Sequence, residues 1–230
     1  MGNFLRNGLT AIALTFILGT FAVIEADAQR VSEVLRRMDV RYKNMQTLQA
    51  DIVMEKYSQQ IDETDRSSGT IKYIPKTSKN VMYIRIDWLK PVEERMAVIG
   101  DEYRIYRPKL KQVYEGKTSS AKNNAKAGSA LAFLSMSRKE LVDNFTHRDL
   151  GDETIAGGTK AVHLELTPKN AATYKLAHLW VDKDGVPVMA RIVEKNDDST
   201  TILISNLKLN ATLDGKDFVI DYPKSIKPIR

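Results

Sequence analysis

Alternating apolar and polar side chains dominate the first half of the chain and predict β-strands. In the clearest run, Val81–Trp88, one face is apolar and suited to burial, while the other face is more polar. The apolar face carries Met82, Ile84, Ile86 and Trp88. Similar runs predict strands at Leu48–Gln60, Gly69–Pro75, Arg95–Ile99, Tyr103–Tyr106 and Leu110–Tyr114. The polar stretch Asp62–Ser68 is expected to be the turn of an opening hairpin.

The second half of the chain predicts a meander of further strands. Asp182-Lys183-Asp184-Gly185 lies between two such runs, and its Asp-Gly pair is a strong signal for the tight turn of a β-hairpin. The predicted strands are Asp149–Ile155, Lys160–Thr167, Lys175–Val181, Val186–Lys195, Thr200–Leu209 and Phe218–Tyr222. The two halves together predict roughly ten or eleven strands and an α+β fold that is mainly β.

Three helices are predicted among these strands. Gln29–Thr47 carries apolar residues near helical spacing, with Ser32 as its expected N-cap. Ala130–Met136 is a compact apolar helix without a polar stripe, and it follows Glu115–Gly128, a polar run that predicts a mobile loop. Ser137–Glu140 has the residues of a capping box, in which serine and glutamate satisfy each other's free amides, and it starts the third helix.

The N-terminal residues predict a secretory signal peptide. The mostly apolar run Leu9–Ile24 follows Arg6, and Ala26-Asp27-Ala28 supplies the small residues of a cleavage site. We expect residues 1–28 to be removed on export to the periplasm and residues 29–230 to form one domain. An uncleaved membrane anchor is the alternative, but the run is short for a span and is interrupted by threonine and glycine.

Charge and cysteine content narrow the classes of partner. Without the signal peptide the chain keeps 34 cations and 27 acids, a net charge of +7, against +6 for the full chain. This charge favours contact with anionic lipid surfaces or acidic partners. Nucleic acid is not an expected partner, because the basic residues are scattered and no nucleic-acid motif is present. The chain has no cysteine, so the fold depends on its core rather than on disulfides.

Catalytic and metal-binding patterns are incomplete. His147, His163 and His178 share no metal-ligand spacing, and we interpret them as ordinary sheet and loop residues. Gly157–Lys160 lacks the upstream glycine and the following Ser/Thr of a phosphate loop, and Asp182–Gly185 lacks the later ligands of a calcium loop. There is no G-x-S-x-G and no cysteine nucleophile. We therefore predict neither an enzyme nor a cofactor.

The order of several short motifs resembles the periplasmic lipoprotein carrier family, LolA and its relatives. The motifs are W-x-x-P at Trp88–Pro91, Gly-Asp at Gly100–Asp101 and Y-x-x-Y-x-P at Tyr103–Pro108. The resemblance continues through Gly69-Thr70-Ile71 to the closing Phe218–Pro223 and covers nearly the whole mature chain. It implies an open, unclosed antiparallel β-barrel of about ten or eleven strands with a helical lid, whose concave face holds acyl chains.

This resemblance implies a periplasmic carrier that shields the acyl chains of outer-membrane lipoproteins, or of lipids, during transfer between membranes. Its partners would be acylated lipoproteins or lipids, an inner-membrane release complex and an outer-membrane receptor, and it would act as a monomer. Periodicity alone does not separate cavity residues from plain core residues. The expected lipid-binding residues of cavity and lid are Met54, Met82, Ile84, Ile86, Trp88, Met96, Tyr106, Leu131, Phe133, Leu134 and Met136.

One departure from the family pattern leaves a second function open. The family places Arg-Pro in the strand after Gly-x-Ile, where the arginine is associated with hydrogen bonding to the lid, but this chain reads Ile74-Pro75-Lys76. Lys76 or Arg85 is a candidate replacement for that latch. The alternative function is a non-catalytic module of the cell envelope that senses lipid or lipoprotein. A carrier predicts a hydrophobic cavity of several hundred cubic ångströms, whereas an interaction module predicts a filled core.

Overall fold

The computed structural model describes residues 28–118 and 136–229, and it places most of them in one antiparallel sheet. Within these ranges the sheet has eleven strands, in agreement with the mainly β class that the alternation predicts. In chain order the strands are β1 (Leu48–Ser58), β2 (Glu63–Ile74), β3 (Tyr83–Lys90), β4 (Glu94–Ile99), β5 (Glu102–Arg107), β6 (Gln112–Lys117), β7 (Phe145–Thr154), β8 (Lys160–Pro168), β9 (Tyr174–Asp182), β10 (Pro187–Glu194) and β11 (Ser199–Leu209).

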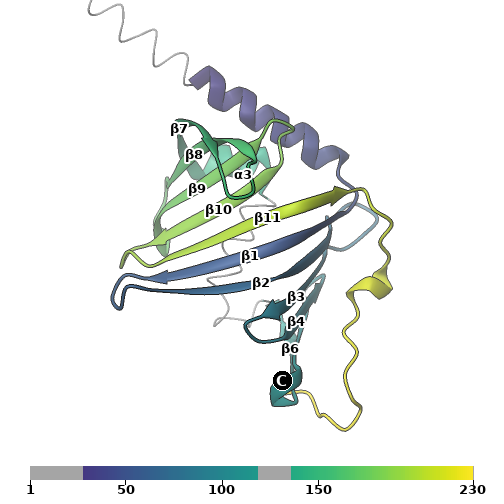
Figure 1. The fold of residues 1–230 in the computed structure, drawn as a ribbon. Coiled ribbons are helices and arrows are strands. Elements are labelled where there is room, and N and C mark those ends of the chain that lie inside the picture. Colours follow the sequence, from purple (N-terminus) through teal and green to yellow (C-terminus); the bar gives the residue numbers. More distant parts are fainter. Residues whose placement is uncertain (1–27, 119–135, 230) are drawn as a thin grey trace, which may run out of the picture.

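The strand order places two meanders side by side. Strands β1 to β6 follow one another on one side of the sheet, β7 to β11 follow one another on the other side, and the halves meet where β1 pairs with β11. The edge strands β6 and β7 do not pair with each other, so the strongly curved sheet stays open (Figure 1). The predicted open, unclosed sheet is therefore confirmed.

Two α-helices accompany the sheet in the part of the chain that the structure describes. The N-terminal helix (residues 28–44) lies along the β7–β11 half, and α3 (Arg138–Asn144) directly precedes β7 (Figure 1). The predicted capping box is confirmed, since the Ser137 side chain accepts from the Glu140 amide and the Glu140 carboxylate accepts from the Ser137 amide. Ser32 is not an N-cap, because the residues before it are already helical. Neither of these two helices has the length and apolar character needed to cross a membrane.

Several predicted boundaries need correction. The polar residues 63–68 belong to β2 rather than to a turn, because they pair with β1 from Ser58 back to Val53. Pro108–Leu110 is the 3-10 helix η1, so the strand predicted from Leu110 begins instead at Gln112. The signal peptide up to residue 27 and the predicted helix at residues 130–136, apart from its last residue, lie outside the described residues.

The inner, concave face of the sheet carries the main hydrophobic core. Cross-strand register places Ala50 opposite Ile71, Ile71 opposite Ile86, and Ile86 opposite Met96, so one apolar row crosses four strands. The helix contributes Val31, Val34, Leu35 and Met38 to the same cluster. Their spacing of three and four residues puts them on one helical face. The apolar periodicities of helix and strands thus meet in one interior.

The C-terminal segment (residues 210–229) crosses the outer face of the sheet and adds no strand to it. The predicted strand Phe218–Tyr222 is wrong, because the 3-10 helix η3 (Gly215–Phe218) ends inside it. The Asp217 carboxylate accepts from Lys72 at 2.7 Å, and the Arg85 guanidinium donates to the Val219 carbonyl at 2.8 Å. Ile220 packs in a separate cluster on this outer face. The apolar residues of the C-terminal segment are therefore buried by packing against the outer face of the sheet, and the segment does not pair as a strand there.

The end of this segment also covers an exposed edge of the sheet. The Ile229 amide donates to the Val113 carbonyl at 2.8 Å, and the Glu115 amide donates to the Ile229 carbonyl at 3.0 Å. These two bonds satisfy backbone groups of β6, which is an edge strand. Free edge strands expose a template for pairing with other chains. The C-terminal segment therefore shields one of the two edges of the open sheet.

A close backbone approach at Gly69 fixes the register between β2 and β3. The register shifts between Ser68 and Gly69, so that Ser68 faces Lys90 while Gly69 faces Trp88. A Cβ atom on Gly69 would lie 2.1 Å from the Asp87 carbonyl oxygen and 2.9 Å from the Trp88 Cα. No side chain can occupy that space without backbone movement. Glycine at this position is therefore a steric requirement of the β2–β3 pairing.

Gly69→Ala should destabilise the fold, because the added methyl group forces β2 away from β3. We expect the free energy of unfolding to fall by about 1–3 kcal/mol, the usual cost of overpacking. Urea denaturation followed by tryptophan fluorescence measures this loss. Gly215→Ala is the matched control, since its Cβ would meet only a Tyr83 ring carbon at 4.0 Å. Equal midpoints for the two variants would contradict this account of Gly69.

Candidate pocket between the helix and the concave sheet

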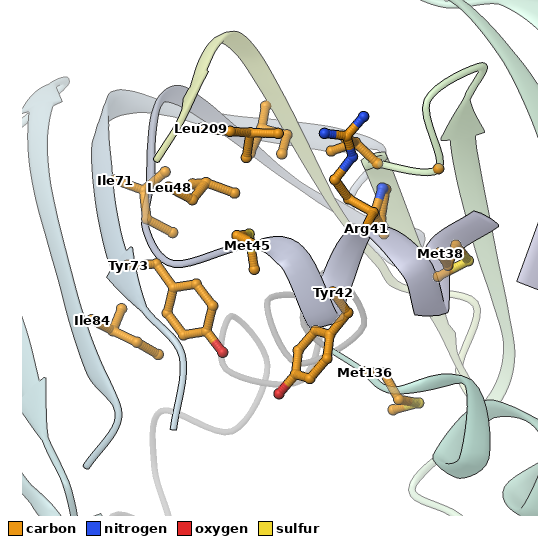
Figure 2. A pocket seen from close by; sticks show the side chains of 14 residues that line it. Met38, Arg41, Tyr42, Met45, Leu48, Ile71, Tyr73, Ile84, Met136 and Leu209 are labelled. Carbon is orange, nitrogen blue, oxygen red and sulfur yellow. The ribbon is translucent and has the colours of Figure 1, made fainter. Parts of the chain in front are cut away.

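An apolar pocket lies between the end of the N-terminal helix and the concave face of the sheet (Figure 2). Met38, Arg41 and Tyr42 form its helical wall, and their spacing of i, i+3 and i+4 places them on one helical face. Met45, directly after the end of the helix, extends this wall. The other lining residues are Leu48, Ile71, Tyr73 and Ile84 on β1–β3, Ile204 and Leu209 on β11, Gly185, Val186 and Pro187 at the β9–β10 hairpin, and Met136. The pocket thus sits where the two halves of the sheet meet.

The pocket is small in this structure. Its volume is about 70 Å³, whereas sites for drug-sized ligands usually have about 300–1,000 Å³. The cavity of several hundred cubic ångströms expected for a carrier is therefore not open at this site. Three of its lining residues are Met38, Met45 and Met136. Methionine is unbranched and flexible, so such walls can rearrange around different apolar ligands.

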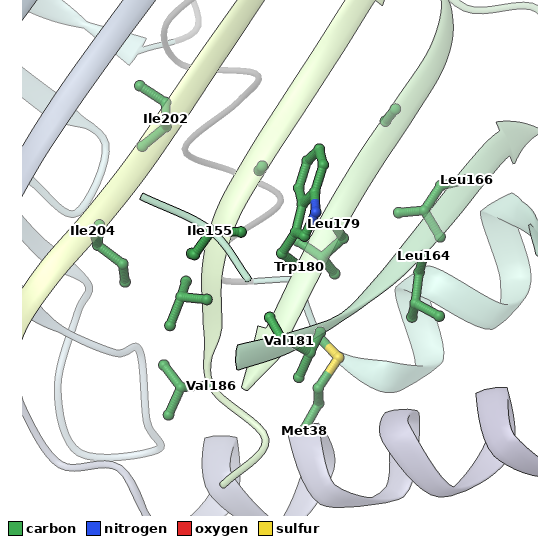
Figure 3. Close-up of a cluster of buried hydrophobic side chains, with 14 of the residues drawn as sticks. Met38, Ile155, Leu164, Leu166, Leu179, Trp180, Val181, Val186, Ile202 and Ile204 are labelled. Atoms are coloured by element: carbon green, nitrogen blue, oxygen red, sulfur yellow. The ribbon is translucent and has the colours of Figure 1, made fainter. Parts of the chain in front are cut away.

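Two of the expected lipid-binding residues, Ile84 and Met136, line this pocket. Ile86 is fully buried in the main core, which continues away from the pocket beneath the β9–β11 side (Figure 3). Met96 is partly buried against that core, and Met82 lies half-buried just before β3. The concave face therefore combines a filled centre with a pocket at one end.

Two other expected residues lie at the opposite end of the concave strands. Met54 and Trp88 are buried in the main core and also border a more polar hollow of about 380 Å³. Glu93, Glu94 and Arg107 are among its lining residues. Arg107 pairs with Glu94, and Glu93 pairs with Arg95. A hollow lined by such ion pairs is poorly suited to an acyl chain, because hydrocarbon would displace the water that solvates them. Of these two hollows, the apolar pocket is therefore the candidate site.

Tyr106 was expected in the lipid-binding cavity, but it lies on the outer face of the sheet. It pairs with Arg95, packs with Ala97 and Val113 in the outer cluster, and its ring lies 6.1 Å from that of Tyr222. It therefore faces away from the concave side. Leu131, Phe133 and Leu134, the other expected lid residues, lie outside the described residues.

Arg85 is not available as a latch over the concave face. It lies on the outer face, where it contacts Asp87 and donates to the carbonyls of Asp217 and Val219. Lys76 is exposed after the end of β2. The arginine missing from the family motif is thus not replaced by Arg85, which instead holds the C-terminal segment.

The pocket combines apolar walls with a few polar atoms. Burial, followed by the neighbouring Tyr42 hydroxyl and the charge of Glu140, raises the pKa of Tyr73 well above its usual range. Tyr73 therefore stays a neutral hydrogen-bonding group. Arg41 is the one charged residue among those described in the lining, and its Nε donates to the Asp184 carbonyl at 3.1 Å.

Sequence reasoning identified the helical residues of this site only as a helical stripe. Met38, Tyr42 and Met45 recur near helical spacing, but the same apolar stripe begins with Val31 in the core. A periodic pattern reports which helical face is buried, and it does not report where the facing sheet leaves space. The contribution of β11 through Leu209 depends on long-range pairing and has no local signal.

The outer face of β7–β9 brings two histidines together that lie far apart in the sequence. His163 Nε2 lies 2.9 Å from His178 Nδ1, and His163 Nδ1 lies 3.1 Å from a Glu153 carboxylate oxygen. Trp180 stacks on the His163 ring and donates to the same carboxylate. With both rings neutral, the Nδ1 proton of His178 is donated to His163 and that of His163 to Glu153. Within the described ranges, no group of three or more His, Asp or Glu is placed to hold a metal ion.

Comparison with known proteins gives similarity at the level of the fold. A family model described as uncharacterized-protein-like matches residues 92–198, and no curated protein matches the chain. The structure of MucB superposes with a TM-score of 0.56 at 16% identity over 83% of this chain and 62% of MucB. This chain therefore spans about three fifths of the length of MucB.

Two further structures show the same fold over almost their whole length. An uncharacterized conserved protein from Thermus thermophilus gives a TM-score of 0.54 at 14% identity, covering 87% of this chain and 99% of that one. The Mycobacterium tuberculosis lipoprotein LppX gives 0.50 at 12% identity, covering 80% and 98%. At 12–16% identity, these likenesses show a shared fold.

The histidine pair predicts a pH-dependent stability. Burial is the main cause that lowers the pKa of both His163 and His178. The negative charges of Glu153 and Glu165 oppose this shift at His163, whereas His163 itself lowers the pKa of His178 further. The unfolded chain consequently binds these protons more readily than the folded chain. This stability is complete above the unfolded histidine pKa of about 6.5 and is lost as the pH falls below it.

We expect the double variant His163→Gln, His178→Gln to lose less stability than the wild type between about pH 7.5 and pH 5. Urea denaturation at several pH values measures this slope, and each protein serves as its own reference at the higher pH. Parallel stability curves for the two proteins would show that the pair does not couple folding to pH.

Proposed function

We propose that the protein binds acyl chains of lipids or lipoproteins in the bacterial envelope, in the pocket between the N-terminal helix and the concave sheet. The observation that carries the proposal is an apolar pocket walled by three methionines at the junction of the two sheet halves. An acyl chain in water costs about 0.8 kcal/mol per methylene, so a dry, adaptable pocket suits it. The basic mature chain and the expected signal peptide of residues 1–28 favour a periplasmic location.

Ligand entry in this proposal requires the pocket to widen. The helix is fastened to the β9–β10 hairpin, since Arg37 donates to the Lys183 carbonyl at 2.8 Å and Arg41 donates to that of Asp184. The facing wall comes mostly from β1 to β3, which belong to the other half of the sheet. A small change of angle between the halves separates these walls without detaching the helix. We propose that this movement lets the protein take cargo from an inner-membrane complex and release it to an outer-membrane receptor, which is the full carrier role.

A second candidate is a lipid- or lipoprotein-sensing interaction module. The small volume of the pocket, about 70 Å³, favours it. MucB, which shares this fold, has also been solved in a complex with MucA from Pseudomonas aeruginosa. In this function the concave face contributes core stability and an outer surface contacts a partner protein.

Native mass spectrometry of the protein purified from a periplasmic extract distinguishes the two functions. Acyl-chain binding predicts stoichiometric adducts, which organic extraction identifies as lipid or acylated protein. An apo mass that stays unchanged after addition of fatty acid would instead favour the interaction module.

Ile84→Asp tests the pocket itself. Ile84 lines the pocket, so a carboxylate there should abolish uptake of a fluorescent fatty acid while the circular dichroism spectrum is retained. Leu89→Asp on the same strand is the matched control, because Leu89 is 61% exposed and lies outside the pocket. Uptake that persists in Ile84→Asp would contradict binding at this site. Unfolding of Ile84→Asp alone would identify Ile84 as plain core.

A further inference from the structure

One charged side chain distinguishes this apolar pocket from a site built only for hydrocarbon. Its lining includes one charged side chain among the described residues, Arg41. Arg41 shares a helical face with Met38 and Tyr42, so its stem belongs to the apolar wall. Figure 2 shows Arg41 extending from the helix at one side of the pocket, and its hydrogen bond to Asp184 places it beside the β9–β10 hairpin.

Most N–H donors of the Arg41 guanidinium have no partner among the described residues. A guanidinium carries five N–H donors, and among the described residues Arg41 uses only Nε, which donates to the Asp184 carbonyl. The other arginines of the helix have acidic neighbours: Arg30 contacts Asp149 and Asp152, while Arg36 and Arg37 contact Glu33. Arg41 forms no ion pair with any described carboxylate.

The described acidic residues around Arg41 form no ion pair with it. The hairpin beside Arg41 carries Asp182, Lys183 and Asp184, and Arg37 lies one turn earlier on the helix. The Asp182 carboxylate is already engaged with the amides of Asp184 and Val186. With Glu33, which contacts Arg37, these groups and Arg41 give three cations and three acids. Arg41 contacts none of these carboxylates, so one cationic side chain lies at the edge of the apolar pocket.

We propose that the pocket selects amphiphiles with an anionic headgroup, and that Arg41 binds the carboxylate or phosphate of that headgroup while the acyl chain enters between the helix and β1–β3. This inference rests on the proposed acyl-chain binding. The planar guanidinium fork suits two parallel hydrogen bonds to a carboxylate or phosphate, which a neutral ester cannot match. The simpler alternative is that the Arg41 stem only covers the pocket while its charged end stays in water.

Two probes of equal chain length separate these possibilities. Laurate and methyl laurate have the same hydrocarbon chain, but only laurate is an anion at neutral pH. Isothermal titration at low ionic strength, below the aggregation limit of each probe, gives both affinities. We expect the wild type to bind laurate about tenfold or more tightly than the ester. The preference should weaken as salt is added, because screening reduces exposed electrostatic interactions.

Variants of the helix assign the preference to one residue. Arg41→Gln should bring the ratio of laurate to ester affinity close to one, and Arg41→Lys should restore part of it. Arg36→Gln is the matched control, since Arg36 lies on the same helix, pairs with Glu33 and is not part of the pocket lining. Circular dichroism and urea denaturation establish that each variant is folded.

The possible outcomes are distinct. Loss of the preference in Arg41→Gln, with retention in Arg36→Gln, would support headgroup binding by Arg41. Equal affinity of the wild type for both probes, or an unchanged preference in Arg41→Gln, would overturn the headgroup inference while acyl-chain binding stands. Failure of both probes to bind the wild type would overturn the headgroup inference and the proposed function together.

Discussion

The pairing of β1 with β11 is the interaction on which the rest of the architecture depends. It joins Leu48 to Leu209 across most of the chain and converts two separate meanders into one sheet. Two further bonds fix the same junction: the Asn210 amide donates to the Thr47 carbonyl at 2.9 Å, and the Gln46 amide donates to the Asn210 side chain at 2.8 Å. Among the strand pairs, this one joins residues that are farthest apart in the sequence. Bringing them together costs chain entropy before any of their contacts form, which slows folding.

The same junction determines where the helix and the pocket lie. The N-terminal helix ends a few residues before β1, so pairing of β1 with β11 directs it back over the β7–β11 half. Val34, Leu35 and Met38 are at most 4% exposed there, and burial of such side chains contributes about 1.5–3 kcal/mol each. Leu48 and Leu209, which are register partners, both line the pocket. The pocket is therefore a consequence of the joint between the halves.

Sequence patterns predicted the elements that depend on local spacing. Alternation located the strands, the Asp-Gly turn located the β9–β10 hairpin, and Ser137 with Glu140 located the start of α3. Patterns failed where an apolar residue has two possible surfaces to cover. Phe218 and Ile220 belong to an apolar run typical of a strand, yet they cover the outer face and neighbouring outer cluster.

Contacts that depend on strand register were also not predicted by the sequence patterns. The face of Tyr106 depends on the turns before β5, which place Ile105 opposite Met96 on the inner side and leave Tyr106 outside. His163 and His178 meet because β8 and β9 pair, and no spacing rule for metal ligands or catalysis reports such a contact. The lining of the pocket has the same origin, since its walls come from the helix, β1–β3, β11 and a hairpin. Local periodicity predicts that these side chains are apolar, whereas only the assembled sheet determines which of them border open space.

A pocket of about 70 Å³ is compatible with acyl-chain binding if the ligand supplies the energy for opening. Ten methylenes transferred from water contribute about 8 kcal/mol at the usual value per methylene. In the proposed function, rearranging three methionines and separating two apolar walls would draw on this energy, and the remainder would set the affinity. Binding would then be reversible, as a carrier requires, because the closed pocket would regain its own contacts when the chain leaves. Retention of the helix on one half of the sheet would confine the movement to the joint between β1 and β11.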